Sequence, residues 1–420
     1  MAGTVVASGT YSVLLDTGFD SASFRLDDSL KGVLNNTTYT LGPAATNYAD
    51  ITDYVDRVVY RRGRRKPADQ FPAGTLTFTM RDEDGILGPY DSTSPYYDPA
   101  NDQPGLAPMR AVQIKRENTP LFTGFVISYQ YVFEMAGPNR VVVQCADDFY
   151  KLAQTNLDEW NVTAQTSSER LTSLLALPEV DYTGTTSIEA GTVNLGHDAA
   201  YTVPDGTNTL GYIGQIQQAE QGRVFCAADG TFTFQARIGN TLSNPIVSFT
   251  DDGTGVPYDN LEVEFDAENV VNRAVVIGLD GDSSTADDAG SQATYFIQNV
   301  SITNSLLHDA TEIAALASYL LEPDPEPRYT AVSTSFSMLS DTQRDDLATI
   351  DIGDTISIHK TIPGLGSEIA SELAVEGIAG EITFDRGHRI TYYTSPTTVV
   401  YELILNDATY GTLNSTNVLG

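Results

Sequence analysis

The sequence predicts a mainly β protein in which two antiparallel β-barrel or sandwich domains flank a small α+β domain. Apolar and polar side chains alternate in many short runs, which is the pattern of half-buried strands. Helical periodicity is concentrated in a central stretch. At 420 residues the chain is too long for one ordinary core, and 41% hydrophobic residues suffice for packed cores throughout.

The expected layout is an N-terminal strand-rich arm, a first β-barrel domain, an α+β domain and a second β-barrel domain, at 1–49, 50–150, 151–248 and 249–420. About five or six alternating strands make up the first barrel, enough to close it. A loop at 82–108 interrupts them, because proline and glycine keep the backbone out of a ladder.

This loop carries three tyrosines, Tyr90, Tyr96 and Tyr97. Long ordered loops are disproportionately functional, and Tyr offers a large contact area at low entropic cost. We therefore predict that the loop contacts a neighbouring subunit. A loop that packs only on its own chain is the alternative.

The central region shows two helix signals. Ser167 or Ser168 is the expected N-cap of the first helix, and Asn208 that of a second helix ending near Gly222. A hairpin follows, with Asp229-Gly230 expected as a two-residue primed turn.

After Pro257 the pattern is again that of strands, continuing to the C-terminal strands. One helix is expected near 309–321, because prolines follow it directly. The two cysteines, Cys145 and Cys226, lie in strand-like runs and are predicted to be buried free thiols.

The charge balance of the chain argues against specific nucleic-acid binding. The chain has 23 Lys and Arg against 56 Asp and Glu, a formal net charge of -33. A protein that binds nucleic acid specifically needs a basic surface, so we expect no specific nucleic-acid binding. An acidic surface serves solubility, cation uptake or the lining of a conduit that DNA contacts only in transit, and composition does not choose among these. No apolar run approaches the roughly 18 residues that span a bilayer, and we expect no membrane insertion and no secretory signal.

One segment opposes the acidic balance. It consists of Arg61, Arg62, Arg64, Arg65 and Lys66 around a glycine. Because Arg offers planar, multidentate donors to carboxylates, we predict docking on an acidic surface of a neighbouring subunit. A solvated turn and a phosphate contact are the alternatives.

Catalytic signatures are lacking. The four histidines share no zinc spacing, and neither a nucleophile elbow nor a phosphate-binding lysine loop occurs. The acidic turns at 82–85 and 280–282 lack the spacing of a calcium loop. We expect no enzyme activity, no catalytic residues, no cofactor and no metal.

Several motifs in the first β region occur in a particular order. They are Asp50-Ile51-Thr52, Arg62-Gly63-Arg64, Phe71-Pro72-Ala73-Gly74-Thr75, the proline-rich loop and Phe122-Thr123-Gly124-Phe125-Val126. In this order the block resembles the minor tail proteins of actinobacteriophages. LEVEFDAENVVNRAVV, ASYLLEPDPEPRYTAV, IDIGDTISI and VEGIAGEI resemble the second β domain of tail-hub proteins, a family that includes the hubs of contractile tails and type VI spikes.

The resemblance implies a siphophage baseplate hub, a virion protein at the distal end of the tail that is made in the host cytoplasm. It implies a homotrimer whose paired barrels form a ring around an axial channel. The implied partners are a distal tail protein or tail tube ring, the tape measure protein and other minor tail proteins. A hexameric distal tail protein, a receptor- or carbohydrate-binding module and a cell-wall hydrolase are the alternatives.

Overall fold

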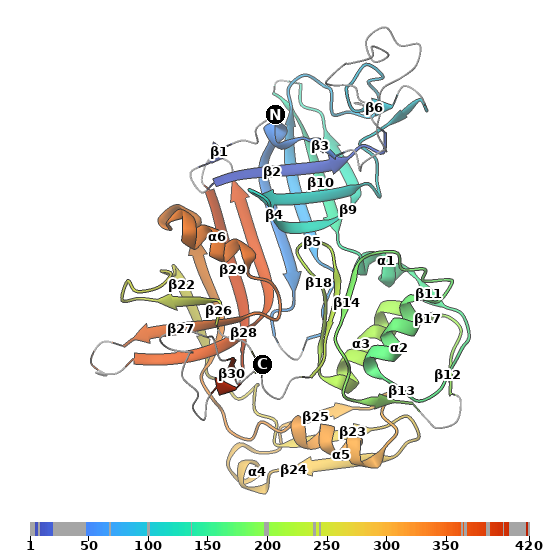
Figure 1. Ribbon diagram of the computed structural model, residues 1–420, viewed down its shortest axis with the longest axis vertical. Coiled ribbons are helices and arrows are strands. Elements are labelled where there is room, and N and C mark those ends of the chain that lie inside the picture. The colour runs from blue at the N-terminus through green and yellow to red at the C-terminus, as the bar shows by residue number, and fades with distance from the viewer. Residues whose placement is uncertain are drawn as a thin grey trace.

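A computed structural model describes residues 9–19, 48–66, 69–98, 101–135, 137–196, 201–237, 245–362, 364, 368–383 and 387–397. It also places four short strands at 5–6, 241–242, 399–402 and 417–418. Most of the expected N-terminal arm lies outside this part of the chain. The protein is mainly β, with a large antiparallel sheet as its central feature (Figure 1).

The large sheet has 14 strands, in the order β1-β2-β8-β9-β10-β5-β4-β28-β29-β26-β22, with β3 beside β2, β27 beside β28 and β21 beside β27. Its N-terminal strands are β1 (Val5–Val6), β2 (Gly9–Asp16), β3 (Tyr48–Asp50), β4 (Val55–Gly63), β5 (Thr75–Asp82), β8 (Ala111–Arg116), β9 (Thr119–Val132) and β10 (Asn139–Ala146). Its C-terminal strands are β21 (Val247–Thr250), β22 (Asn260–Glu264), β26 (Arg328–Ser335), β27 (Thr355–Thr361), β28 (Glu368–Thr383) and β29 (Gly387–Pro396).

Alternation explains why these segments are strands. In β5, Leu76, Phe78 and Met80 are buried while the residues between them face outward, as the two-residue period of a pleated strand requires. β8 buries Val112 and Ile114 in the same way. The inward rows of the strands form one apolar core.

The two β regions are joined by hydrogen bonds. β4 pairs with β28 from Gly63 opposite Gly377 to Arg57 opposite Thr383, and Figure 1 shows the two strands side by side. Strands of the first and second β regions thus share the 14-stranded sheet. The expected division into separate barrel domains stays a prediction.

The central region packs α1 (Phe149–Gln154), α2 (Ser167–Leu175) and α3 (Thr209–Glu220) beside small sheets. These sheets pair β11 (Asn156–Leu157) with β17 (Thr207–Asn208), β12 (Trp160–Val162) with β16 (Tyr201–Val203), and β13 (Gln165–Thr166) with β15 (Asn194–Leu195). A fourth sheet joins β14 (Thr186–Ile188), β19 (Phe232–Gln235) and β18 (Arg223–Cys226). The remaining short strands are β6 (Tyr97–Asp98), β7 (Gln103–Pro104), β20 (Thr241–Leu242), β30 (Val399–Glu402) and β31 (Asn417–Val418).

The two central helix predictions differ in their caps. Asn208 caps α3 as predicted, its side chain accepting a hydrogen bond from the backbone N–H of Gly211 at 3.0 Å. The predicted cap of α2 was wrong by one residue. Thr166 is the cap, because Glu169 stands three residues later and completes a reciprocal capping box.

The predicted two-residue turn of the β18–β19 hairpin was also wrong. Ala227 and Thr231 still pair, with the N–H of Ala227 bonded to the carbonyl of Thr231 at 2.9 Å, so three residues form the loop. Gly230 has a φ of 92°, which fits a three-residue loop closed by a left-handed glycine.

Within its described residues, the second β region has three α-helices where the sequence predicted one. The predicted helix is α5 (Ala310–Tyr319); α4 (Ala289–Tyr295) and α6 (Asp341–Thr349) were missed. Both are short and lack a continuous apolar stripe, but side-chain caps from Asp288 and Ser340 begin them. α4 and α5 accompany a small sheet of β23 (Arg273–Ile277), β24 (Ser283–Asp287) and β25 (Asn299–Ile302), at the lower end of Figure 1.

Candidate functional site: a charged junction between the β regions

The basic segment lies where β4 meets the second β region. Arg62 and Arg64 are only 3% and 9% exposed, whereas Arg65 and Lys66 are exposed. Gly63 has a φ of 75°, and a Cβ there would lie 2.3 Å from the carbonyl oxygen of Glu376. Only glycine fits this close approach, which turns Arg62 and Arg64 into the protein.

Glu376 is the centre of the junction. Its Oε2 accepts a hydrogen bond from Nε of Arg64 at 2.8 Å, and its Oε1 accepts from the guanidinium of Arg223 at 2.8 and 3.1 Å. Ser395 Oγ donates to Oε1 at 2.7 Å. One buried carboxylate of β28 thus joins the end of β4 to β18 and β29.

Electrostatics keep this cluster charged. Burial alone would raise the pKa of Glu376, but Arg223 and Arg64 lower it to about 2. Burial lowers the pKa of Arg64, and the neighbouring Glu376 opposes that shift. A carboxylate between two guanidinium groups is therefore ionised at neutral pH, and its bonds are charge-assisted.

A second ion pair lies beside the first. Arg62 NH1 is 2.5 Å from Oδ1 of Asp351, and Oδ2 of Asp351 accepts the backbone N–H of Ala228 at 2.8 Å. Ala228 belongs to the β18–β19 loop of the central region. The two pairs together connect all three regions of the chain.

The other basic residues also face groups of the same chain. The guanidinium of Arg64 stands 4.5 Å above the ring of Phe71, and those of Arg61 and Arg65 lie 5.8 and 5.3 Å from the ring of Tyr393. Lys66 Nζ lies 3.8 Å from carboxylates of Glu264 and Glu268. Such ring contacts and exposed pairs are weak individually.

The acidic partners of Arg62 and Arg64 are therefore internal, because both side chains are buried against Asp351 and Glu376. Only 3% and 9% of these two residues is exposed, and their contact with a neighbouring subunit stays a prediction. For the exposed Arg65 and Lys66 and the half-buried Arg61, contact with another subunit stays a prediction.

The tyrosine loop, residues 82–108, is packed at its base and presents Tyr90 at its surface. Leu87 and Leu106 are buried, and the carboxylate of Asp82 accepts the N–H groups of Ile86 and Leu87 at 2.9 and 3.3 Å. Tyr96 meets Tyr54 edge-on and the Tyr97 hydroxyl donates to Asp102 at 2.8 Å. Tyr90 is 87% exposed. Its predicted contact with a neighbour stays a prediction.

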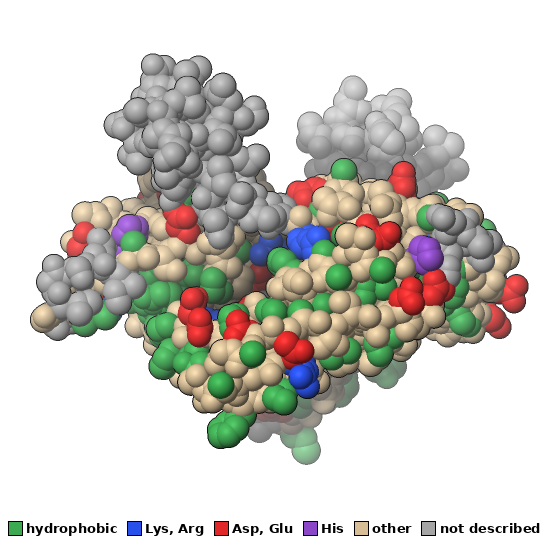
Figure 2. Space-filling model, turned by 90° about the horizontal axis from the view of Figure 1, so that it is seen from below, with side chains coloured by type: hydrophobic (Ala, Val, Ile, Leu, Met, Phe, Trp, Pro, Cys, Tyr) green, Lys and Arg blue, Asp and Glu red, His purple; other side chains and the backbone are tan. Residues whose placement is uncertain are grey.

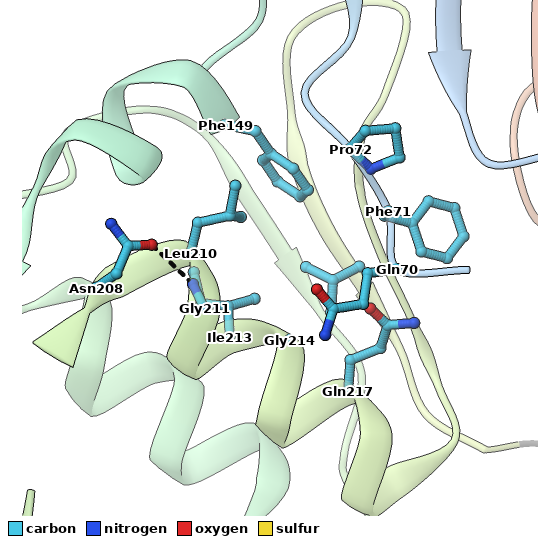
Figure 3. Close-up of a pocket in the computed structure, with 11 residues that line it drawn as sticks. Gln70, Phe71, Pro72, Phe149, Asn208, Leu210, Gly211, Ile213, Gly214 and Gln217 are labelled. Carbon is cyan, nitrogen blue, oxygen red and sulfur yellow. Dashed lines mark hydrogen bonds between the residues drawn. The ribbon is translucent and has the colours of Figure 1, made fainter. Parts of the chain in front are cut away.

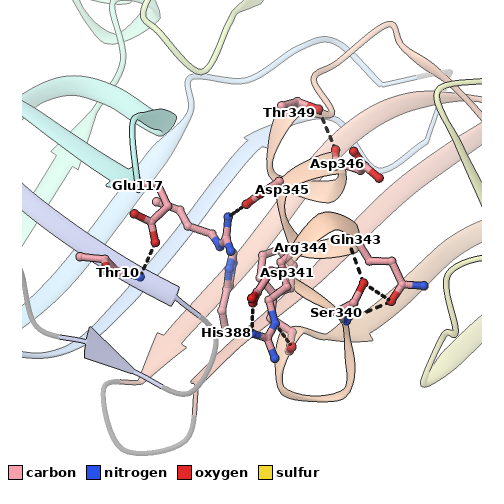
Figure 4. Close-up of polar contacts among 12 residues, drawn as sticks. Thr10, Glu117, Ser340, Asp341, Gln343, Arg344, Asp345, Asp346, Thr349 and His388 are labelled. Carbon is pink, nitrogen blue, oxygen red and sulfur yellow. Dashed lines mark hydrogen bonds and ion pairs between the residues drawn. The ribbon is translucent and has the colours of Figure 1, made fainter.

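A second polar network joins the N-terminal strands to the C-terminal ones. His388 is fully buried, with the hydroxyls of Tyr11 and Tyr60 at 3.0 and 3.1 Å from its two ring nitrogens. Burial, together with Arg116, lowers the pKa of His388 to about 3, so the ring is neutral. Arg116 pairs with Asp345 of α6, and Figure 4 shows how α6 lies over His388.

A cavity of about 370 Å³ lies between α3 and the chain that leads into β5. Apolar side chains and the amides of Asn208, Gln70 and Gln217 surround it, and Figure 3 shows Gln70 and Gln217 lying next to each other. None of its lining residues is charged. The sequence showed no signal for it, because its walls come from separate segments of the chain, at 70–72, 149, 208–217 and 224.

The described part of the chain holds no group of three or more His, Cys, Asp or Glu side chains placed to bind a metal ion. Cys145 and Cys226 are buried, and burial raises the pKa of both thiols. Among the described helices, none is long and apolar enough to cross a membrane. The charged side chains buried at the junction form ion pairs, and these pairs connect strands.

The sequence analysis did not identify the acidic residues of the junction, Glu376 and Asp351. It also did not identify Arg223, which donates to Glu376. One signal was present, because Glu376 is a lone acid in the apolar run LAVEGIAG, and a charge inside such a strand is almost never buried without a partner.

The fold and the junction define a β-rich protein whose charged residues connect its parts. No protein-family model matches the chain, and no curated protein sequence does. Solved structures do match. The tail protein from Neisseria meningitidis MC58 superposes with a TM-score of 0.57 and 11% identity, over 92% of this chain and 96% of that one.

Two prophage proteins match similarly. The 43 kDa tail protein of prophage MuSo2 from Shewanella oneidensis gives a TM-score of 0.55 and 10% identity, over 92% of this chain and 98% of that one. Prophage tail protein gp18 from Listeria monocytogenes EGD-e gives a TM-score of 0.50 and 11% identity, over 91% of this chain and 94% of that one. The chain therefore has the fold of these phage tail proteins along nearly its whole length.

Proposed function

We propose that this chain is a structural subunit of a phage tail tip, a hub that works by assembling into a ring between the tail tube and the distal tip. The observation that carries the proposal is the fold shared with three tail proteins, which extends over more than nine tenths of each chain. A match over most of both chains is more informative than a shared module, because nearly every part of each then has a counterpart.

The internal geometry suits a ring subunit. Glu376 and Asp351 join β4, β18 and β28 by buried ion pairs, so the two β regions are held in one orientation. A ring of few subunits closes only if each subunit keeps a fixed angle between its contact surfaces. A rigid junction inside the subunit supplies that angle.

The finer assignment follows the sequence resemblance. The hub is a homotrimer of the actinobacteriophage minor tail type, located at the distal end of the virion tail. Its channel passes the tape measure protein and then DNA. The ring carries three times the chain's charge of -33, and lumen carboxylates repel phosphate within a Debye length of about 8 Å.

Contacts between subunits, and with the neighbouring tail ring, use the exposed parts of the two predicted surfaces. These are Arg65, Lys66 and the half-buried Arg61 on one side, and Tyr90 with the loop around Tyr96 and Tyr97 on the other. Tyr90 has the exposure that such a contact needs. The function is structural and needs neither catalysis nor a cofactor.

The mass of the purified protein in solution tests the proposal, measured by light scattering against a chain mass of 45.3 kDa. We expect three copies. Six copies would contradict the hub and indicate a hexameric adaptor ring. For a monomer, the same measurement is repeated after mixing with isolated tail tubes, and a monomer that fails to bind the tube end contradicts the tail-tip role.

A further inference from the structure

One exposed aromatic residue has a backbone conformation that aromatic residues avoid. Phe296 has a φ of 59° and a ψ of -179°, a region that is essentially restricted to glycine. Its side chain is 81% exposed, and the next residue, Ile297, is 55% exposed. A strained backbone therefore displays two large apolar side chains on the surface.

A buried side chain holds this conformation. Asn272 is fully buried, and its side-chain amide donates to the carbonyl of Phe296 at 2.6 Å while its side-chain oxygen accepts the N–H of Gln298 at 2.8 Å. The same amide also donates to Ser291 at 3.1 Å, and Ser291 in turn donates to the carbonyl of Pro323 at 2.5 Å.

The network therefore binds the backbone on both sides of Ile297 without using either apolar side chain. Strain persists in a native protein only when its surroundings over-determine it, and it concentrates at functional positions. A glycine would satisfy the same hydrogen bonds without strain, so the described hydrogen bonds do not explain why an aromatic residue stands here.

The surroundings indicate what receives it. Residues 266–326 contain eleven Asp and Glu and one basic residue, Arg273, a formal charge of -10. Arg273 is itself paired with Asp287 at 2.6 Å. Figure 2 views the molecule from below, and acidic side chains are scattered over this face among hydrophobic ones. A second copy of so acidic a chain would be repelled here.

We propose that Phe296 and Ile297 form a docking knob for a different protein, one that offers a hydrophobic pocket with a Lys- and Arg-rich rim. The aromatic ring fills the pocket, and the acidic surface selects the basic rim and speeds the encounter. This inference is independent of the proposed tail-tip role, because it requires only a basic partner protein.

The test introduces the photo-crosslinking residue p-benzoylphenylalanine in place of Ile297, in the full chain expressed from its native locus. We expect irradiation to yield one heterologous adduct whose crosslinked peptide, mapped by mass spectrometry, is rich in Lys and Arg around apolar residues. The yield of the adduct is expected to fall at least tenfold with Phe296→Ala and to decrease in high salt. The same photo-residue at Met338, another exposed apolar position, is the control.

Strain is tested separately on the isolated protein. Glycine normally lowers stability relative to alanine, but at this backbone conformation Phe296→Gly is expected to melt at a higher temperature than Phe296→Ala. An adduct between two copies of the chain, no adduct at all, or an adduct unchanged by Phe296→Ala would overturn the docking knob. A lower melting temperature for the glycine variant would show that the backbone conformation of Phe296 costs no strain energy.

Discussion

At the scale of single residues, Glu376 shows how much one buried charge can connect. Arg64, Arg223 and Ser395 all bond to its carboxylate, and they come from three different segments. Forming such a cluster costs desolvation energy, so its presence does not by itself imply high stability. Removing one member has a clearer consequence, because it leaves the others buried and unpaired.

Glu376→Gln tests this. The variant keeps the shape but leaves two guanidinium groups facing a neutral amide, and we expect a loss of about 3–5 kcal/mol in the free energy of unfolding, the range for broken buried pairs. Urea denaturation measures it. Glu381→Gln is the matched control, because Glu381 lies on the same strand in an exposed pair with Arg57 and should cost less than about 1 kcal/mol. Equal losses would contradict the assigned role.

His388 makes a prediction about pH. Its folded-state pKa is about 3 against 6.5 for the free side chain, so the unfolded chain takes up the proton first. Stability from this residue is present above pH 6.5 and is lost as the pH falls toward 3, by about 2 kcal/mol between pH 6.5 and 4.5.

The measurement compares the unfolding free energy of the wild type and of His388→Gln across that range. Glutamine can bond to Tyr11 and Tyr60 but does not titrate, so the difference between the two proteins should shrink as the pH falls. Asp147 does not confound this comparison, since burial raises its pKa to about 7 in both proteins. Parallel curves would show that His388 is not the group responsible.

At the scale of elements, the pairing of β4 with β28 is the contact on which the sheet depends. The two strands approach closely around Gly63 and Gly377. A Cβ on Gly377 would lie 2.4 Å from the carbonyl oxygen of Arg64, and backbone cannot move aside as a flexible side chain can. The close approach of β4 and β28 therefore requires glycine at position 377.

Gly377→Ala is expected to destabilise the protein by roughly 1–3 kcal/mol, the cost of overpacking, and to speed hydrogen exchange in β4 and β28. Exchange followed by mass spectrometry gives both the size and the place of the change. Gly88→Ala is the control, because a Cβ there meets nothing closer than 3.8 Å. Unchanged exchange in β4 would show that the strands tolerate the added methyl group.

At the scale of the whole molecule, the surface keeps the acidic balance of the composition. Four arginines are buried, but so are five carboxylates, and burial therefore leaves the excess of exposed acidic side chains in place: the buried residues are Arg62, Arg64, Arg116, Arg170, Asp82, Asp98, Asp147, Glu220 and Glu376. Copies with a charge of -33 repel over a Debye length of about 30 Å at 0.01 M salt but only about 8 Å at 0.15 M.

The mass measurement is therefore made at both ionic strengths. We expect a larger fraction of trimer at the higher ionic strength, because salt screens the repulsion between the subunits. A trimer that salt weakens would instead be held mainly by exposed ion pairs such as Arg65 and Lys66 would make.

Much of the local structure followed from the sequence. The alternating run TLTFTMRDED, at 75–84, is one of the strand signals of the first β region, and β5 occupies Thr75–Asp82 within it. Asn208 before an apolar stripe predicted the start of α3, and the helix begins there. Both signals lie within one short window, where the neighbours in sequence are also the neighbours in space.

Where the charged side chains lie depends on the tertiary structure. A mainly β fold, an acidic chain and a conspicuous basic segment at 61–66 could be predicted from the residues alone. The sequence did not determine that Arg64 meets Glu376, 312 residues later, or that Asn272 holds Phe296 outward. Such contacts depend on which strands pair and how closely, and pairing is set by the packing of the entire core, not by any short window of residues.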